Sequence, residues 1–260
     1  MQDEPFSTEY EGFFAEFYDI IQADVSDVPF FVWAAAEYGS PVLDLGSGTG
    51  RLLLPMAQAG AEVVGLDSSP DMLELCRRKL ATLDDGTRGR VVLVQGDMRS
   101  FRADRPFALA VLGCNTVLHL LTLEDQVAAL RGIHAHLRPA GILIVDNSVP
   151  PVAAWVKSMD QEAVFKFANP VNGNAVIDKV TASFDFANQV EHDFIVLEEY
   201  AGDKLVRAAR TRCSMAIMFP RELRLLLTHC GFEVLHVWKN HRREPFDGEA
   251  REVIVMARKA

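Results

Sequence analysis

Three glycines at alternate positions, Gly46, Gly48 and Gly50, follow a short apolar run and precede a stretch that reads as a helix. The run, Pro41–Leu45, is typical of a buried parallel strand. A strand, a glycine turn and a helix bring bare backbone N–H groups and a helix N-terminus up to a nucleotide-like ligand. Glycine suits this turn because its backbone needs a positive φ and a side chain would block the ligand. The segment therefore predicts a nucleotide-like binding site.

Two residues of this segment indicate the class of ligand. A dinucleotide fingerprint has the form Gly-x-Gly-x-x-Gly or Ala, and Arg51 occupies its last position here. Asp44, just before the turn, would repel a pyrophosphate but can accept hydrogen bonds from an ammonium group. We therefore expect a ligand with a ribose and an amino-acid end, and not a diphosphate.

Acidic residues also lie at the ends of the next two predicted strands. Asp67 lies 21 positions after Gly46, the spacing at which a carboxylate meets a ribose diol. Ser68 then leads into a helix, where Met72 is expected either under an adenine ring or in the core. Asp97 follows the third strand and fits either a ligand contact or a simple helix cap.

The segment Val42–Gly50 resembles the S-adenosylmethionine (SAM) motif of class I methyltransferases. The resemblance implies SAM as the cofactor, with Asp97 accepting from the exocyclic amine of its adenine and the backbone N–H of Met98 meeting a ring nitrogen. A generic glycine turn after a buried strand is the alternative. The cofactor-binding residues are then expected to be Asp44, Gly46, Ser47, Gly48, Gly50, Arg51, Asp67, Ser68, Met72, Gly96, Asp97, Met98, Leu112, Gly113 and Leu118.

A histidine after the fourth predicted strand is the first candidate for the chemistry. The segment Gly113–Leu120 resembles the part of glycine N-methyltransferase and of the aminosugar N-methyltransferases that has a histidine just before a leucine. The resemblance places His119 in the substrate site, where an imidazole could take a proton or only orient the acceptor. The alternative is a satisfied core histidine, which is the usual reading of a single histidine in an apolar stretch.

Two tyrosines near the N-terminus are the other candidates. The segment Phe13–Asp19 resembles the lid helix that closes the SAM site of small-molecule N-methyltransferases. Tyr10 and Tyr18 are eight positions apart, close to two helical turns, so we expect both on this helix. Their rings and oxygens would tolerate a cation over the transferred methyl group. His119, Tyr18 and Tyr10 are therefore the expected catalytic residues.

The order of predicted elements indicates an α/β fold with a Rossmann-like, seven-stranded, mostly parallel sheet whose last strand is antiparallel. An inserted antiparallel β-sheet follows strand 5, and a helical lid precedes strand 1. We expect the lid over residues 1–40, the SAM-binding core over 41–149 and 220–260, and the inserted sheet, covering the substrate site, over 150–219. The core strands are expected at Pro41–Leu45, Glu62–Asp67, Val91–Gln95, Phe107–Leu112, Ile142–Asp146, Phe232–Trp238 and Glu252–Ala257.

Bulk properties limit the partners. A formal net charge of −10 argues against a nucleic-acid partner, which needs a basic surface. No apolar run is long enough to span a bilayer, and Met1–Pro5 lacks a signal-peptide pattern. The four cysteines have neither metal nor disulfide spacing, so we expect a cytoplasmic protein without a metal. The sequence leaves the oligomeric state open.

These features predict a SAM-dependent methyltransferase that acts on the nitrogen of a small molecule, such as an amino sugar or another natural-product intermediate. An O- or C-methyltransferase on the same scaffold is the nearest alternative. An NAD(P) oxidoreductase is disfavoured by Arg51 and Asp44. A non-catalytic SAM-binding protein is the remaining alternative. Transfer needs no covalent enzyme intermediate, so alignment of the acceptor with the C–S bond and exclusion of water would supply much of the catalysis.

Overall fold

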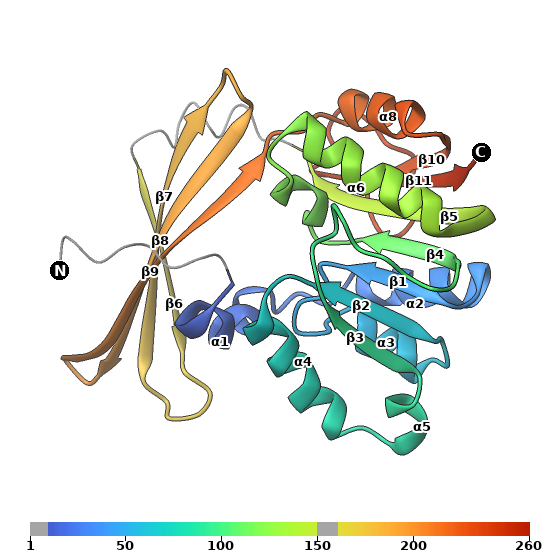
Figure 1. The fold of residues 1–260 in the computed structure, drawn as a ribbon. Coiled ribbons are helices and arrows are strands. Elements are labelled where there is room, and N and C mark those ends of the chain that lie inside the picture. Colours follow the sequence, from blue (N-terminus) through green and yellow to red (C-terminus); the bar gives the residue numbers. More distant parts are fainter. Residues whose placement is uncertain (1–9, 150–160) are drawn as a thin grey trace.

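The structure, a computed structural model, describes residues 10–149 and 161–260. Seven strands form one sheet in the order β10-β11-β5-β4-β1-β2-β3 (Figure 1). Strand β11 is antiparallel to both of its neighbours, and the pairs among β1 to β5 are parallel, which confirms the predicted core sheet. The strands are β1 (Val42–Leu45), β2 (Val63–Asp67), β3 (Val91–Gln95), β4 (Phe107–Leu112), β5 (Leu137–Ser148), β10 (Phe232–Trp238) and β11 (Glu252–Lys259).

Helices cover both faces of this sheet, because its central strands are apolar on both sides. Every residue of β1 and β4 is buried. One cluster of apolar side chains joins the sheet to α6 and α8, and a second joins it to α2, α3 and α4. The helices are α2 (Val28–Tyr38), α3 (Leu53–Gln58), α4 (Pro70–Ala81), α5 (Asp85–Arg88), the 3-10 helix η1 (Thr116–His119), α6 (Leu123–His136) and α8 (Pro220–His229).

A second sheet lies beside the core, as predicted. Its four strands are antiparallel in the order β6-β7-β8-β9. Helix α1 (Gly12–Ile21) lies between this sheet and the core (Figure 1). The strands are β6 (Glu162–Ala168), β7 (Ala175–Asp185), β8 (Val190–Ala201) and β9 (Lys204–Ala216).

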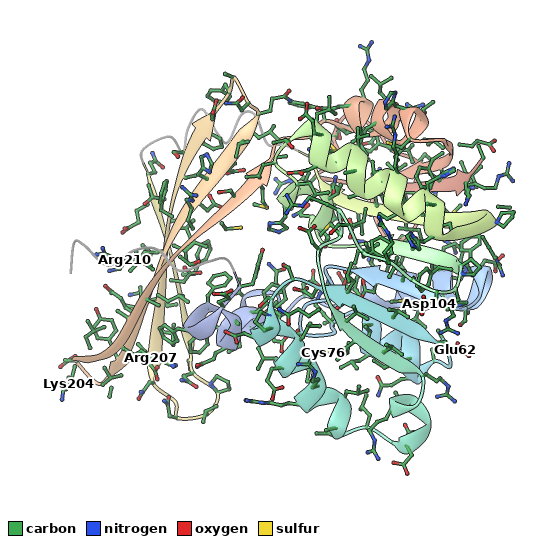
Figure 2. All side chains as sticks on the ribbon, viewed as in Figure 1. Glu62, Cys76, Asp104, Lys204, Arg207 and Arg210 are labelled. Carbon is green, nitrogen blue, oxygen red and sulfur yellow. The ribbon has the colours of Figure 1, made fainter. Side chains whose placement is uncertain are left out.

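Helix α1 is held on the sheet by apolar and ionic contacts. Phe13, Phe14 and Phe17 are buried in a cluster with apolar side chains of β7, β8 and β9. Arg207 of β9, labelled in Figure 2, lies over the Phe13 ring, 3.7 Å from its centroid, and pairs with Glu16 of the helix. The N-terminal helix therefore connects the two sheets.

Three boundaries differ from the sequence-based expectations. Tyr10 precedes α1 and has a φ of +58°, so it is not on the helix as expected; Gly12 begins the helix instead. Strand β5 begins at Leu137, five residues before the expected start at Ile142. The register shifts between these two residues, where Ala140 has a positive φ, and both Leu137 and Ile142 pair with β4. Strand β6 was not predicted, since nearly all of its residues are exposed and show no apolar alternation.

Residues 1–9 of the predicted lid, with the Met1–Pro5 segment, and residues 150–160 of the predicted insertion lie outside the described residues. Among the residues that are described, no helix has the length and apolar character needed to cross a membrane.

Candidate active site

The loop after β1 turns through three glycines with positive φ: Gly46 at +66°, Gly48 at +53° and Gly50 at +84°. The Gly46 N–H donates to the carbonyl of Leu66, which ties the loop to β2. A Cβ at Gly46 would lie 2.6 Å from the Thr116 side chain. Both the backbone conformation and the close approach of Thr116 therefore require glycine here.

A cavity of about 350 Å³ opens at the carboxyl ends of β1, β2 and β3. In open α/β sheets this edge is where ligands bind. Eight of the expected cofactor residues line the cavity. They are Gly46, Gly48, Asp67, Ser68, Met72, Gly96, Asp97 and Met98.

Asp67 is the central carboxylate of this cavity. Its Oδ2 accepts from the Gly48 N–H at 2.7 Å and its Oδ1 from the Ser69 N–H at 2.8 Å. Burial raises the pKa of Asp67, and these backbone donors oppose the rise. The carboxylate is thus fixed at the end of β2 between the glycine loop and the N-terminus of α4.

Asp97 lies on the opposite wall and already has a charged partner. Nε of Arg99 is 2.9 Å from each of its carboxylate oxygens, and Arg99 also reaches Asp125 of α6 at 3.2 Å. The Arg99 guanidinium lowers the pKa of Asp97, so the carboxylate is ionised. Arg99 and Asp125 line the same cavity.

The three expected catalytic side chains come together at one end of this cavity. The Tyr10 hydroxyl lies 3.2 Å from Nε2 of His119, and the rings of Tyr10 and Tyr18 meet edge to face with centroids 5.6 Å apart. Burial raises the pKa of Tyr18 well above its ordinary value, so this phenol keeps its proton. Cys114, at a φ of +51°, lies beside them and lines the cavity too.

A second cavity, of about 620 Å³, begins where the first one ends. Tyr10, Tyr18, Cys114 and His119 line both cavities and form their shared wall. The rest of the second cavity is lined by the end of α1, including Ile20 and Ile21, and by residues of β6 to β9. The helix and the second sheet therefore enclose a space that meets the first cavity at the tyrosines and His119.

Carboxylic acids lie on the sheet side of this second cavity. Asp178 of β7 and Asp193 of β8 both line it. Burial raises the pKa of Asp178 to about 6 and also raises that of Asp193. Near Asp193 on the same strand, burial and the Asp193 carboxylate raise the pKa of Glu191 to about 7. The second cavity is therefore suited to a positively charged guest.

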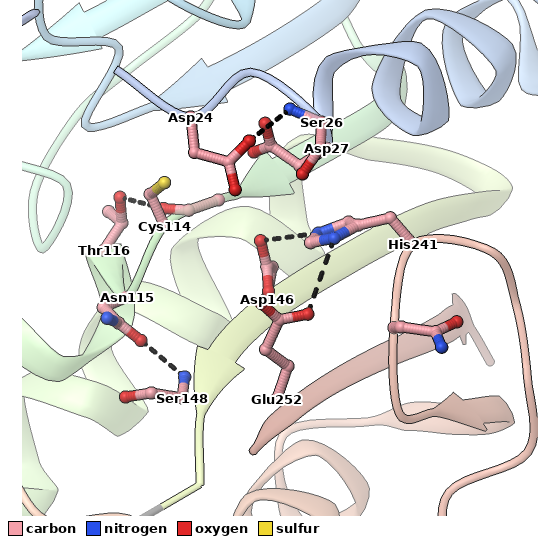
Figure 3. A network of polar contacts seen from close by, with 12 residues as sticks. Asp24, Ser26, Asp27, Cys114, Asn115, Thr116, Asp146, Ser148, His241 and Glu252 are labelled. Atoms are coloured by element: carbon pink, nitrogen blue, oxygen red, sulfur yellow. Dashed lines mark hydrogen bonds and ion pairs between the residues drawn. The ribbon is translucent and has the colours of Figure 1, made fainter. Parts of the chain in front are cut away.

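An ionic network lies next to Cys114 of the shared wall, and Figure 3 shows its part around Asp27, Asp146 and His241. Arg51 binds both oxygens of Asp27, at 2.6 and 2.7 Å, and also contacts Cys114. Nε2 of His241 lies 3.1 Å from Asp146, whose carboxylate raises the pKa of His241 against the opposing effect of burial. Asp27, Asp146 and His241 are close enough to hold a metal ion. Since Arg51 already occupies Asp27, these groups fit an ionic network better than a metal centre.

Comparisons with known proteins agree with this geometry. Residues 42–141 match the family described as a methyltransferase domain. The chain is 28% identical over 251 residues to the cypemycin N-terminal methyltransferase of a Streptomyces species, covering 95% of this chain and 96% of that protein. It is 33% identical over 145 residues to the dTDP-3-amino-3,4,6-trideoxy-alpha-D-glucopyranose N,N-dimethyltransferase of Streptomyces venezuelae, covering 53% of this chain and 58% of that protein.

The fold is also shared with solved methyltransferases. The CcbJ methyltransferase of Streptomyces caelestis superposes with a TM-score of 0.75 at 23% identity, over 90% of each chain. The methyltransferase domain at 42–141 and the relative that spans nearly the whole chain identify it as a SAM-dependent methyltransferase. This sets aside the oxidoreductase and the non-catalytic alternatives.

The first cavity of the methyltransferase fits SAM. SAM carries an adenine, a ribose diol and a methionyl ammonium, and acidic oxygens near the glycine loop suit the last two. Asp67 lines the cavity at the loop. Asp44 lies beneath the loop. Its Oδ2 is buried and has no hydrogen-bond partner in the described part of the chain, and burial raises its pKa to about 7. A cationic group of a ligand at the glycine loop would compensate this buried, unsatisfied carboxylate.

The remaining expected cofactor residues of the methyltransferase do not line the cavity. Ser47, Leu112 and Leu118 are buried, and Arg51 belongs to the ionic network. Gly50 packs closely on Cys76 and Leu54, and Gly113 on Leu52. These residues support the loop from below and do not line the cavity. Asp44 does not line it either, so its carboxyl would act on a cationic ligand group from beneath the loop.

Several residues that line the cavities were not expected from sequence. Ser69 caps α4, where its Oγ accepts from the Met72 N–H, and its Oγ also donates to the Tyr10 carbonyl at 2.8 Å. Asp178 interrupts the apolar alternation of Val176 and Val180, a signal that could have identified it. The residues that line the first cavity and were not expected from the sequence are Leu66, Ser69, Arg99, Cys114, Thr116, Leu120 and Asp125.

Proposed function

We propose that this methyltransferase transfers the SAM methyl group to the nitrogen of a small molecule, an amino sugar or another natural-product intermediate. The observation that carries the proposal is the second cavity, which meets the cofactor cavity at Tyr10, Tyr18 and His119 and has Asp178 and Asp193 in its wall. Carboxylates attract a protonated amine more strongly than a neutral phenol, and they would repel a carbanion acceptor. Of the relatives named above, one is described as an N-terminal methyltransferase and another as an N,N-dimethyltransferase of an amino sugar.

Each residue then has a role in holding the two reactants. Asp67 accepts from the ribose hydroxyls and Asp44 balances the methionyl ammonium, while Asp97 and the Met98 N–H border the adenine. Bound SAM supplies a methyl carbon on a sulfonium, open to attack in line by a neutral amine. Tyr10 and Tyr18 close the methyl end of the cavity and exclude water from it.

His119 prepares the acceptor. An amine reaches the cavity mostly as ammonium and must lose a proton before its lone pair can attack. The His119 imidazole, oriented by the Tyr10 hydroxyl at 3.2 Å, can take that proton or hold the amine in line. The Cys114 thiol is not the base, because burial raises its pKa to about 11 and no thiolate forms near neutral pH.

The product of the reaction tests this proposal. Purified protein would be incubated with methyl-labelled SAM and a panel of amino sugars, peptides with a free N-terminus, phenols and carboxylic acids. Mass spectrometry and NMR would locate the label. Label on nitrogen supports the proposal. Label confined to oxygen or carbon would contradict it and favour the O- or C-methyltransferase alternative.

A further inference from the structure

Asp178 is a buried carboxyl group in an otherwise apolar setting. It is 5% exposed, and within residues 10–149 and 161–260 its Oδ1 has no hydrogen-bond partner. Its neighbours on the same face of β7, Val176 and Val180, pack in the apolar cluster under α1. The carboxyl lines the second cavity, so a molecule in that cavity can reach it.

Among the residues that the structure describes, no cation compensates this carboxyl. Burial alone accounts for its raised pKa, with no contribution from a neighbouring charge. Lys166 of β6 also lines the cavity, but Phe165 is the residue that pairs with Asp178, so the Lys166 side chain leaves the opposite face of its strand. An uncompensated buried carboxyl is costly, and a bound cation would remove that cost.

Asp178 is also far from the point of methyl transfer. Asp193 pairs with Cys213, whose Sγ lies 3.8 Å from the Tyr10 hydroxyl, so Asp193 marks the reacting end of the cavity. Asp193 pairs on its other side with Ala182, four residues along β7 from Asp178. Four residues of extended strand span about 13 Å. Asp178 therefore lies at the far end, too distant to take a proton from the reacting amine.

We propose that the methyl acceptor carries a second cationic group, which forms an ion pair with Asp178 while a separate amine is methylated at Tyr10 and His119. The proposal rests on the proposed N-methylation and adds the acceptor class, a diamine or an amine that carries a guanidinium. The two nitrogens have different tasks. The reacting nitrogen must be neutral, whereas the anchoring group stays protonated and holds the acceptor against the cofactor.

Binding without transfer tests the anchor by itself. Protein saturated with S-adenosylhomocysteine would be titrated calorimetrically with a straight-chain ten-carbon α,ω-diamine and with the matching ten-carbon amino alcohol. These probes differ only in the distal group. We expect the diamine to bind about tenfold or more tightly in the natural protein, the value of one charge-assisted hydrogen bond.

Two variants complete the titration. Asp178→Asn should bind both probes equally, whereas Asp203→Asn, the same charge change in the exposed β8–β9 turn, should keep the preference. Equal binding in the natural protein, no diamine binding, or a preference retained by Asp178→Asn would overturn the proposal. A thermal melt of Asp178→Asn would check that this variant is folded. Because the titration contains no methyl donor, its outcome is separate from whether nitrogen is the atom methylated.

Discussion

The Tyr10 hydroxyl and Nε2 of His119 lie 3.2 Å apart, although 109 positions separate the two residues in the chain. The Tyr10 carbonyl accepts from Ser69, and the Gly12 N–H donates to Asp71 at 2.6 Å. The start of α4 therefore holds the turn that precedes α1. Since Asp67 bonds the Ser69 N–H, cofactor site and lid share one set of hydrogen bonds. The position of the tyrosine thus depends on the same strand end that would hold the ribose.

Removing the His119 imidazole should slow transfer without loosening the cofactor. We expect His119→Ala to lower kcat about 100-fold, the usual contribution of a positioned acid or base. Tyr18→Phe should lower kcat as well. The dissociation constant of SAM, measured by calorimetry, should change little in both variants. His229→Ala, an exposed histidine on α8, is the control, and unchanged turnover in both test variants would refute the assignment.

Removing the charge of Asp67 should act on the cofactor. Asp67→Asn is expected to weaken SAM binding about 10- to 100-fold, because the ribose hydroxyls lose an ionised acceptor. Calorimetric titration with SAM measures the change. Asp104→Asn makes the same charge change at an exposed position (Figure 2) and should bind SAM normally. SAM affinity that is equal in the two variants would place the ribose elsewhere.

Asp44 should make stability depend on pH. Its pKa is about 7 in the folded protein and 3.8 ordinarily, so the folded state keeps a proton that the unfolded chain releases. The free energy of unfolding should therefore fall as the pH rises from 4 towards 7, by about 3 kcal/mol from this group. Urea unfolding of the natural protein and of Asp44→Asn across this range measures the effect. In Asp44→Asn the free energy of unfolding should depend much less on pH. Curves of this free energy against pH that run parallel for the two proteins would contradict the buried state of Asp44.

The pair of Arg51 and Asp27 should be sensitive to losing one partner. Their side chains are each 10% exposed, so Arg51→Ala leaves a buried carboxylate uncompensated and should cost about 3 kcal/mol. The double variant Arg51→Ala with Asp27→Asn should recover part of that loss. Urea unfolding of the two single variants and the double variant measures it, and strictly additive losses would show that the pair is not coupled.

The core of the fold was predictable because its signals are local. The glycines at 46, 48 and 50 and the acids at 67 and 97 end strands whose apolar runs are continuous, and strand order follows from the βα alternation. Lining residues from the second sheet were not predictable. Asp178 and Asp193 become part of a cavity only because α1 packs against β7 and β8, and α1 lies far from both strands in the sequence.

The position of Tyr10 shows the same limit. The helical spacing correctly predicted that Tyr10 lies near Tyr18, but the structural reason is different. Tyr10 precedes the helix in a left-handed conformation. A hydrogen bond from Ser69 to the Tyr10 carbonyl and one from the Gly12 N–H to Asp71 hold that turn. Periodicity cannot show such a turn, because its stabilising partners lie about 60 positions away.

A crystal structure with bound S-adenosylhomocysteine tests the central claim most directly. We predict the ribose hydroxyls on Asp67, the adenine beside Asp97 and Met98, and the sulfur facing Tyr10, Tyr18 and His119 with the second cavity beyond it. A complex in which the sulfur points away from these three side chains, or in which the ligand binds outside the cavity at the ends of β1 to β3, would contradict the account.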